Sequence, residues 1–218
     1  AMQELLTGKR RLPGFEGEWE MTTLGQLGAT YGGLTGKTKA DFGSGAARFI
    51  PFLNVVTNSI IDREFFEPVR VGIGENQNRA AQGDLFFNGS SETPEEVGLC
   101  AVLRNEEPDL YLNSFCFGFR PHPDAGLDGL YLAFFFRGPS GRDLMKSLAQ
   151  GSTRYNLSKR ALLGVEFGLP GSDEQRAISH VLHEMDAEID ALRSKLAKAR
   201  MIKQGMMHNL LTGKIRLV

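Results

Sequence analysis

Residues 172–212 have the sequence SDEQRAISHVLHEMDAEIDALRSKLAKARMIKQGMMHNLLT, and this stretch decides the architecture of the chain. Ser172 and Gln175 have the spacing of a capping box directly after Pro170-Gly171, so we predict that a helix begins at Ser172. Apolar residues then alternate at steps of four and three, the pattern of a coiled-coil seam; they are Ile178, Leu182, Met185, Ile189, Leu192 and Leu196. A helix of this length spans roughly 60 Å at about 1.5 Å per residue, so we expect it to need a partner helix.

The charges of the predicted helix fall into two blocks. Acidic residues dominate as far as Asp190, whereas residues 193–203 carry five bases and no acid. Acid near the N-terminus and base near the C-terminus also compensate the macrodipole of a single helix, which is one explanation. The other is antiparallel pairing with a second copy, in which each acidic half lies against a basic half. The clean separation of the blocks favours the antiparallel pair.

The end of the chain repeats a segment from its beginning. Residues 210–217, LLTGKIRL, match residues 5–12, LLTGKRRL, at seven of eight positions. The two copies lie too far apart to be units of a solenoid. We interpret them as the two ends of one period of a cyclic pattern, in which the end of one unit runs into the start of the next. Residues 1–14 are then a stub, the last turn or two of a helix whose body comes from elsewhere.

The region between the stub and the long helix predicts an α+β globule. Its short apolar runs are separated by Gly, Pro, Asn and Asp, and we predict strands at residues 49–56, 69–73, 84–88, 99–103, 115–119 and 166–169. Helices are predicted at residues 128–136 and 140–149, the second with Ser140 as its N-cap. The expected organisation is the stub at 1–14, a globular domain at 15–170 and the long dimerisation helix at 171–218.

Composition restricts the class of partner. Residues 15–165 contain 14 Lys and Arg against 18 Asp and Glu, so any nucleic-acid contact depends on local basic clusters. The two cysteines, Cys100 and Cys116, have no CxxC spacing, and we expect buried free thiols in a reducing compartment. Neither a signal peptide nor an apolar run of about 18 residues occurs, so we predict a cytoplasmic protein with no membrane partner.

Motifs for catalysis are not found in the sequence. Gly32–Thr38, GGLTGKT, is similar to a phosphate loop but has three residues, not four, between its first Gly and Gly36-Lys37. We expect a glycine-rich loop near a polyanion, or a plain turn, rather than a nucleotide site. His180 and His183 do not have the spacing of a zinc-binding His-Glu-x-x-His helix. The chain is therefore predicted to be non-catalytic, without a metal or cofactor of its own.

Several segments together resemble the specificity subunit of type I restriction-modification systems. They are YNLSKRAL at 155–162, VEFGLP at 165–170, EQRAI at 174–178 and LLTGK at 210–214. LLTGK at 5–9, followed by LPGF at 12–15 and Trp19, is similar to the junction at which such a subunit enters its next target-recognition domain. Members of this family usually carry two recognition domains and two conserved helices. This chain has one of each, so the resemblance implies a half-length form with one DNA target-recognition domain.

The resemblance implies a role and partners. Two copies would form a homodimer that reads a palindromic bipartite site in double-stranded DNA and guides methyltransferase subunits and, through them, the endonuclease (restriction) subunit. S-adenosylmethionine, ATP and Mg would be used by those partner subunits and not by this chain. The alternative is a stand-alone DNA-binding protein, or an inactive remnant, without a methyltransferase partner.

Polar clusters in the globule supply side chains that can contact DNA. Arg and Lys pair with guanine, and Asn and Gln with adenine. We predict contacts by Lys37, Lys39, Gln77, Asn78, Arg79, Ser90, Arg154 and Asn156. Arg154 and Lys37 are the best candidates for phosphate or guanine, and Gln77 and Asn78 for adenine. The same clusters also have the composition of solvated turns.

Overall fold

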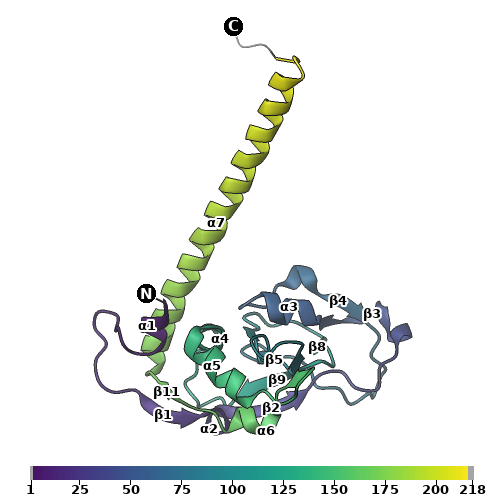
Figure 1. Cartoon of the computed structure of the whole chain (residues 1–218). Helices are drawn as coiled ribbons and strands as arrows, with labels where there is room; N and C mark the ends of the chain where they lie inside the picture. Colours follow the sequence, from purple (N-terminus) through teal and green to yellow (C-terminus); the bar gives the residue numbers. More distant parts are fainter. Residues whose placement is uncertain (1, 216–218) are drawn as a thin grey trace. The chain divides into compact units, whose positions relative to one another are not determined.

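The computed structural model describes residues 2–215 and consists of two units. The first unit, Ala1–Ser179, contains every sheet of the described chain, and we call it the head (Figure 1). The second unit, His180–Val218, contains the continuation of the last helix, α7 (Ser172–Leu211). The predicted α+β class and the predicted long C-terminal helix are both confirmed.

Two larger sheets organise the head. One has four antiparallel strands in the order β2 (Gly28–Gly32), β9 (Cys116–Pro121), β5 (Leu85–Asn88) and β7 (Cys100–Val102). The other has the order β4 (Glu67–Val69), β3 (Phe42–Ile50) and β8 (Leu110–Leu112), and β3 runs parallel to β8. Two small antiparallel pairs, β1 (Glu20–Thr23) with β11 (Glu166–Leu169) and β6 (Ser90–Ser91) with β10 (Tyr155–Asn156), join segments that are far apart in the sequence.

Short helices connect and cover the strands. They are α1 (Met2–Leu6), α2 (Leu24–Leu27), α3 (Phe52–Thr57), α4 (Gly129–Arg137), α5 (Pro139–Leu148) and α6 (Lys159–Leu163), with 3-10 turns η1 (Lys39–Asp41) and η2 (Arg63–Phe65). Helix α4 is central, because all residues from Leu130 to Phe136 are buried. Its first turn is capped by Asp128, whose Oδ1 accepts from the Tyr131 backbone N–H at 2.8 Å.

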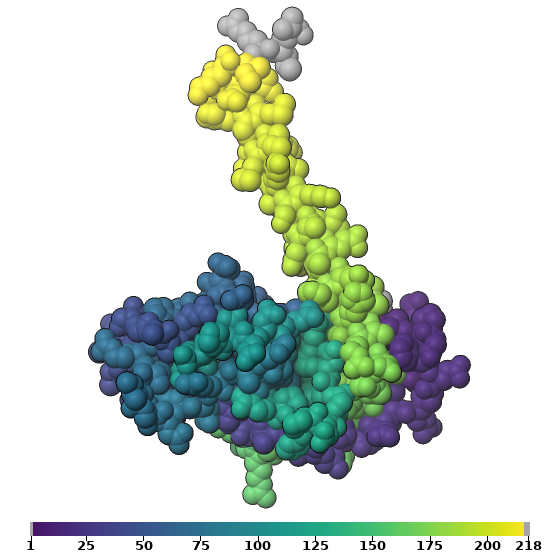
Figure 2. Space-filling model, turned by 180° about the vertical axis from the view of Figure 1, so that it is seen from behind, coloured from purple at the N-terminus to yellow at the C-terminus, as the bar shows by residue number. Residues whose placement is uncertain are grey.

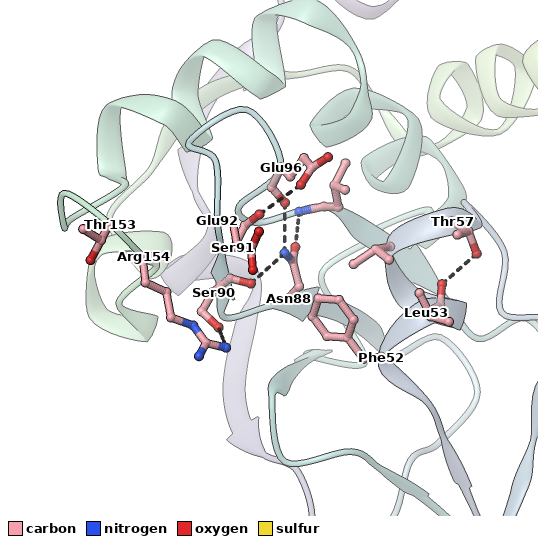
Figure 3. A pocket seen from close by; sticks show the side chains of 12 residues that line it. Phe52, Leu53, Thr57, Asn88, Ser90, Ser91, Glu92, Glu96, Thr153 and Arg154 are labelled. Atoms are coloured by element: carbon pink, nitrogen blue, oxygen red, sulfur yellow. Dashed lines mark hydrogen bonds between the residues drawn. The ribbon is translucent and has the colours of Figure 1, made fainter.

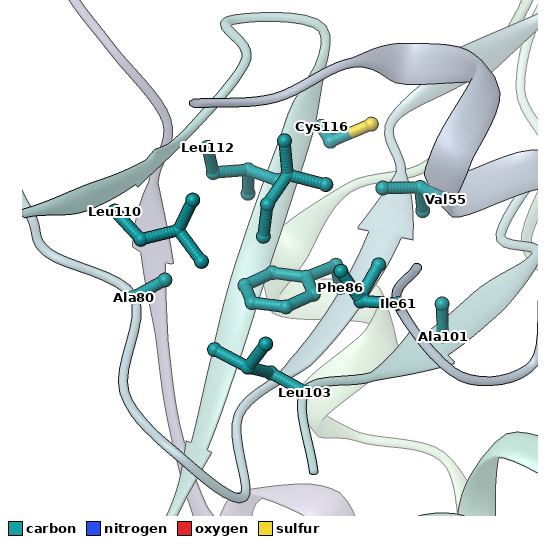
Figure 4. Packing of buried hydrophobic residues seen from close by; sticks show 10 residues of the cluster. Val55, Ile61, Ala80, Phe86, Ala101, Leu103, Leu110, Leu112 and Cys116 are labelled. Carbon is teal, nitrogen blue, oxygen red and sulfur yellow. The ribbon is translucent and has the colours of Figure 1, made fainter. Parts of the chain in front are cut away.

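A hydrophobic core connects the two larger sheets. Phe86 of β5 packs with Leu110 and Leu112 of β8 and with Val55 of α3, and all four side chains are fully buried (Figure 4). Burial of each such side chain contributes roughly 1.5–3 kcal/mol, so this cluster fixes the sheets against each other. Cys116 lies in the same cluster and Cys100 is buried elsewhere in the head; both are free thiols, as predicted. Burial raises the pKa of both thiols.

The strand predictions were confirmed at four places and wrong at two. Those at 84–88, 99–103, 115–119 and 166–169 correspond to β5, β7, β9 and β11. Residues 49–56 were predicted as one strand, but the strand ends at Ile50, and Pro51 caps helix α3 instead. Proline lacks the N–H that a strand needs and tolerates the start of a helix. The prediction at 69–73 fails beyond Val69, where β4 ends and the segment continues without regular structure to Gly72 and Gly74.

One of the helix predictions needs a correction at its N-terminus. Residues 128–136 are confirmed as α4 and residues 140–149 as α5, but Gly138 is the N-cap of α5 and Ser140 lies inside the helix after Pro139. Proline is favoured at the first helical position because its missing N–H has no acceptor there. The predicted start of the long helix at Ser172 is confirmed, because α7 begins at this residue. The Gln175 side chain accepts from the Asp128 backbone N–H at 2.8 Å and donates to the Pro170 carbonyl at 2.8 Å.

The first turns of α7 are fixed to the head by a buried carboxylate. Glu174 is 3 % exposed and accepts two hydrogen bonds from the Arg11 guanidinium, at 2.5 and 2.7 Å, and one from Trp19 Nε1 at 3.2 Å. Charge-assisted bidentate bonds of this kind are stronger than neutral ones. The adjacent residues Glu174 and Gln175 therefore hold the start of the helix from two sides, through Arg11 and through Asp128.

The rest of α7 exposes its apolar seam. Of the six predicted seam residues, Ile178 and Leu182 are buried within the chain. The other four are exposed: Met185 at 43 %, Ile189 at 44 %, Leu192 at 56 % and Leu196 at 51 %. This part of the helix is drawn in yellow-green to yellow in Figure 2. None of the described helices is long and apolar enough to cross a membrane.

Candidate nucleic-acid interface

A groove of about 670 Å³ crosses the head beside the four-stranded sheet. Its walls are the loop after β2, the turn between β5 and β6, the segment leading into β9, and the ends of β10 and α6. Two lysines line it, and none of its lining residues is acidic, so we call it the basic groove; it is formed by Gly32–Lys37, Phe42, Gly89, Ser90, Ser114–Phe117, Asn156 and Lys159.

The glycine-rich loop that forms one wall is held close to strand β8. A Cβ added at Gly33 would lie 2.0 Å from the carbonyl oxygen of Asn113, so only glycine fits there. The Leu34 N–H donates to the Leu112 carbonyl oxygen at 2.7 Å. The need for a close backbone approach explains the glycine, and no phosphate-binding role is required for it.

Two predicted adenine readers are bonded to this loop. The Gln77 side chain accepts from the Thr35 N–H at 3.1 Å and donates to the Thr35 carbonyl at 2.8 Å. Asn78 Nδ2 donates to the Gly32 carbonyl at 3.1 Å. Their amide groups shape the groove wall, and reading a base with either of them requires breaking a bond to the loop.

Lys37 is engaged in an ion pair. Its ammonium donates to both carboxylate oxygens of Glu75, at 2.6 and 2.7 Å, and to the Arg70 carbonyl at 2.6 Å. The side chain is only 7 % exposed. Hydrogen bonds from Lys37, and then from the Gly72 N–H and Gln77, hold the pKa of the Glu75 carboxyl below its usual range. The charge of Lys37 is therefore compensated inside the head.

Three other predicted residues come together from distant parts of the sequence. Strand β6 pairs with β10 so that Ser90 lies opposite Asn156, and Arg154 Nη2 donates to the Ser90 hydroxyl at 3.3 Å. The Arg154 and Asn156 side chains are exposed. The structure thus places an amide and a hydroxyl in the basic groove, and the guanidinium of Arg154 bonds that hydroxyl from outside the groove lining.

A second cavity of about 900 Å³, the side pocket, adjoins this cluster (Figure 3). Ser90 and Arg154 line it opposite Leu53 and Thr57 of α3. Asn88, 1 % exposed, lies at its base and bonds the backbone of residues 90, 96 and 99, which fixes the loop after β6. Two acids, Glu92 and Glu96, line this pocket, so its charge suits a polyanion less well than that of the basic groove.

Sequence reasoning missed Lys159 and the aromatic side chains of the groove. Lys159 is exposed, lies 5.9 Å from the Phe117 ring centroid and forms no ion pair in the described chain. Phe115 is 60 % and Phe42 is 36 % exposed. Lys159 occurs in the motif at 155–162, but its position in the groove depends on the pairing of β6 with β10. An uncompensated lysine can hold a phosphate, and the exposed rings beside it can stack on bases.

The remaining two predicted residues, like Gln77, Asn78 and Arg154, do not line the groove. Arg79 forms an exposed ion pair with Asp109 at 3.0 Å, and Lys39 is exposed in η1. The described residues contain no group of three or more His, Cys, Asp or Glu side chains placed to hold a metal ion. The site therefore offers positive charge, amides and aromatic surface, which are means of binding nucleic acid.

Comparison with protein families supports the same class of function. Residues 16–199 match the family model described as "Type I restriction modification DNA specificity domain". The match covers the head beyond the N-terminal segment and α7 as far as Ala199.

Solved structures with a similar fold include specificity subunits. The HsdS subunit from Thermoanaerobacter tengcongensis has a TM-score of 0.60 and 18% identity, with 95% of this chain and 49% of that one covered. The type I S subunit from M. genitalium has a TM-score of 0.55 and 16% identity, with 92% and 48% covered. A chain from a structure of type I R-M complex assembly has a TM-score of 0.64 and 18% identity, with 95% and 50% covered. The present chain thus spans about half the length of the solved chains it matches.

Proposed function

The chain belongs to the family of type I restriction modification DNA specificity domains, and we propose that it acts as a homodimeric specificity subunit that reads a palindromic bipartite DNA site. In this role the head recognises one half-site and α7 sets the distance to the second head. The chain carries no chemistry itself and directs methyltransferase and endonuclease subunits, which supply S-adenosylmethionine, ATP and Mg.

The observation that carries the homodimer is the exposed seam of α7. From Met185 to Leu196 four large apolar side chains repeat at heptad spacing and are 43–56 % exposed. Burial of such side chains in a coiled coil contributes roughly 1–2 kcal/mol each. Acidic residues precede Asp190 and basic residues follow Arg193, so an antiparallel second copy matches both the seam and the charges. Two identical heads related by a two-fold axis read two identical half-sites in inverted order.

The basic groove is the proposed DNA-reading surface of the head. Arg154 and Asn156 can pair with base edges, and Lys159 can neutralise a phosphate. The head has no bulk excess of positive charge, since acids outnumber bases between residues 15 and 165. The uncompensated Lys159 in the groove and the exposed Arg154 beside it therefore decide where the polyanion binds.

The proposal is tested by coexpressing the chain with the type I methyltransferase subunit of the same genome and mapping N6-methyladenine by single-molecule sequencing. We expect one palindromic bipartite motif, which is lost in the variant Arg154→Ala/Asn156→Ala. The control is Arg176→Ala, an exposed arginine paired with Asp173 on α7, which should leave the motif unchanged.

Each other outcome has a defined meaning. An asymmetric motif would show that a different specificity chain supplies the second half-site, and would contradict the homodimer. Absence of methylation in the presence of active methyltransferase, together with DNA binding by the isolated chain, would favour a stand-alone DNA-binding protein. Absence of both would favour an inactive remnant.

A further inference from the structure

The turn between β8 and β9 carries an exposed aromatic ring. Strand β8 ends at Leu112 and β9 begins at Cys116, so residues 113–115 connect the two larger sheets. Both flanking side chains belong to the hydrophobic core. Phe115, the last residue of the turn, lines the basic groove and is 60 % exposed. The chain thus leaves the core, presents one large apolar side chain to the groove and returns to the core.

The backbone of Phe115 is held on both sides. Its N–H donates to Asn113 Oδ1 at 2.9 Å, and the buried Asn113 side chain in turn donates to the Ile50 carbonyl at 3.0 Å. The Phe115 carbonyl accepts from the Gly89 N–H at 3.0 Å. A Cβ added at Gly89 would lie 3.2 Å from this carbonyl oxygen, so the two turns approach closely. The ring is therefore positioned before DNA binds, which lowers the entropic cost of any contact it makes.

The same hydrogen bonds connect the ring to the polar side of the groove. The Gly89 carbonyl accepts from the Leu157 N–H at 2.9 Å. Leu157 directly follows Asn156, the end of β10, and Lys159 begins α6. Phe115, Asn156 and Lys159 all line the basic groove. An apolar ring, an amide and a cation consequently face one space on a connected backbone.

The other exposed ring of the groove is less free to contact a ligand. Phe42 is 36 % exposed and packs edge-on against Phe49, with 5.1 Å between the ring centroids. Phe49 belongs to a buried cluster beneath the three-stranded sheet. Phe42 is thus partly a core residue, whereas most of the Phe115 side chain is exposed.

The chemistry of duplex DNA restricts what a phenyl ring can contact. The faces of paired bases are stacked on one another, and the base edges in the major groove carry hydrogen-bonding atoms together with one apolar group, the 5-methyl of thymine. A ring placed on a polar edge removes water without supplying a hydrogen bond, which is unfavourable. A ring placed on the methyl group buries apolar surface on both partners. The major groove is about 12 Å wide and admits a two-stranded ribbon, so a single turn can enter it.

We propose that Phe115 is a specificity-determining residue that selects one T·A pair in each half-site through an apolar contact with the thymine 5-methyl group. The inference rests on the proposed reading of DNA by the basic groove and adds the identity of one base pair to it. Asn156 and Lys159 supply a hydrogen-bonding amide and a positive charge. Phe115 supplies a contact that no polar side chain of the groove can replace.

Methylation mapping with the coexpressed methyltransferase tests the position. In the variant Phe115→Ala we expect a motif that is unchanged except at one T·A pair of each half-site, which should accept other bases. The control is Phe65→Ala, because Phe65 lies in η2 outside the groove and is 48 % exposed. This variant should leave the motif unchanged. Thermal unfolding of Phe115→Ala should match the wild type, since the lost ring is mostly exposed.

Replacement of single thymines by 2′-deoxyuridine tests the methyl contact itself. Uracil keeps the base pair and lacks only the methyl group. For the full wild-type chain, we expect one such replacement in each half-site to raise the dissociation constant at least threefold in fluorescence anisotropy, as burial of one methyl group predicts. Phe115→Ala should bind the thymine and uracil duplexes equally at that position. Phe115→Leu, which keeps an apolar side chain, should retain part of the discrimination.

The other outcomes overturn the inference in distinct ways. Equal effects of uracil on the wild type and on Phe115→Ala, or half-sites without a T·A pair, would exclude the thymine contact while leaving the reading of DNA by the head intact. A rise in 2-aminopurine fluorescence on binding that is lost in Phe115→Ala would show that the ring inserts between bases instead. A wild-type chain with neither a methylated motif nor any sequence preference would overturn the proposed function as well.

Discussion

At the scale of single residues, Glu174 of α7 connects the N-terminal segment with Trp19, the residue before β1. It accepts from Arg11 and from Trp19, and only 3 % of its surface is exposed. Replacement by Ala leaves the Arg11 guanidinium and the indole N–H without this acceptor. Arg11 is 24 % exposed and keeps part of its hydration, so the variant loses less free energy of unfolding than a protein that loses one partner of a fully buried ion pair.

We expect Glu174→Ala to lower the free energy of unfolding of the head by about 2 kcal/mol. Urea denaturation followed by Trp19 fluorescence measures this change at the site itself, since Trp19 is the only tryptophan. The control is Arg176→Ala two residues along the helix, whose ion pair with Asp173 is exposed and should contribute less than about 0.5 kcal/mol. Equal losses for the two variants would show that Glu174 has no special role.

A second residue-scale prediction separates the two lysines of the basic groove. Lys159 forms no ion pair in the described chain, whereas Lys37 is bound to Glu75. We expect Lys159→Ala to weaken binding of double-stranded DNA and to reduce the slope of log affinity against log salt by about one. Lys37→Ala should leave the slope nearly unchanged and instead increase amide hydrogen exchange in residues 32–38.

Fluorescence anisotropy of labelled DNA between low and moderate salt measures these slopes. Lys146→Ala is the control for loss of a surface charge, because Lys146 lies outside the groove and pairs with Glu95 at 3.0 Å. A larger slope change for Lys37→Ala than for Lys159→Ala would show that DNA contacts the loop wall that carries Lys37 and not the wall that carries Lys159.

The chemistry of single residues could be predicted from the sequence more easily than their partners. Arg154 and Asn156 were selected for the base edges they can pair with, and the structure brings them to Ser90. Lys37 was selected by the same reasoning, but it is engaged by Glu75, which lies 38 residues away. Neither contact is encoded locally, since both depend on how the sheets bring distant loops together.

At the scale of elements, the prediction concerns the seam of α7. We expect Leu192→Gln to raise the dimer dissociation constant at least tenfold without lowering the stability of the monomer, because Leu192 is 56 % exposed in the single chain. Ser194→Gln introduces the same side chain on the opposite face of the helix and should have no effect. Sedimentation velocity gives the constants, and thermal unfolding of the head gives the stability. A monomeric wild-type chain would remove the basis of this prediction.

Elements that depend on local patterns could be predicted, and elements that depend on distant pairing could not. Helix α7 follows from an apolar period that is complete within its own sequence. Strands β6 and β10 have two residues each and exist only because they pair across 64 and 66 positions. In residues 49–56 the β-branched residues favoured a strand, whereas Pro51 ended it and began α3. A local signal from one residue therefore outweighed the average propensity of the segment.

At the scale of the whole molecule, the length of α7 sets the distance between the two half-sites that the proposed dimer reads. Seven residues inserted into α7 between Asp190 and Arg193 keep the heptad phase and lengthen the helix pair by about 10 Å. At about 3.4 Å per base pair, the unread spacer of the methylated motif should grow by three base pairs while both half-sites stay the same. Methylation mapping with the lengthened chain measures the spacer. A motif of unchanged spacing would show that α7 does not separate the two heads.

The repeated segments at residues 5–12 and 210–217 each end a helix with a left-handed glycine, Gly8 with a φ of 70° and Gly213 with a φ of 68°, and this affects how a gene of this kind can change. Recombination at both coding repeats with a second gene that carries the same repeats exchanges everything that lies between them, which is one complete head with its helix. The exchanged unit begins directly after one helix cap and ends with an equivalent cap, so the joints keep their backbone geometry whatever head is inserted. Target preference can thus be inherited as a cassette, in a single event, without adaptation of the scaffold that receives it.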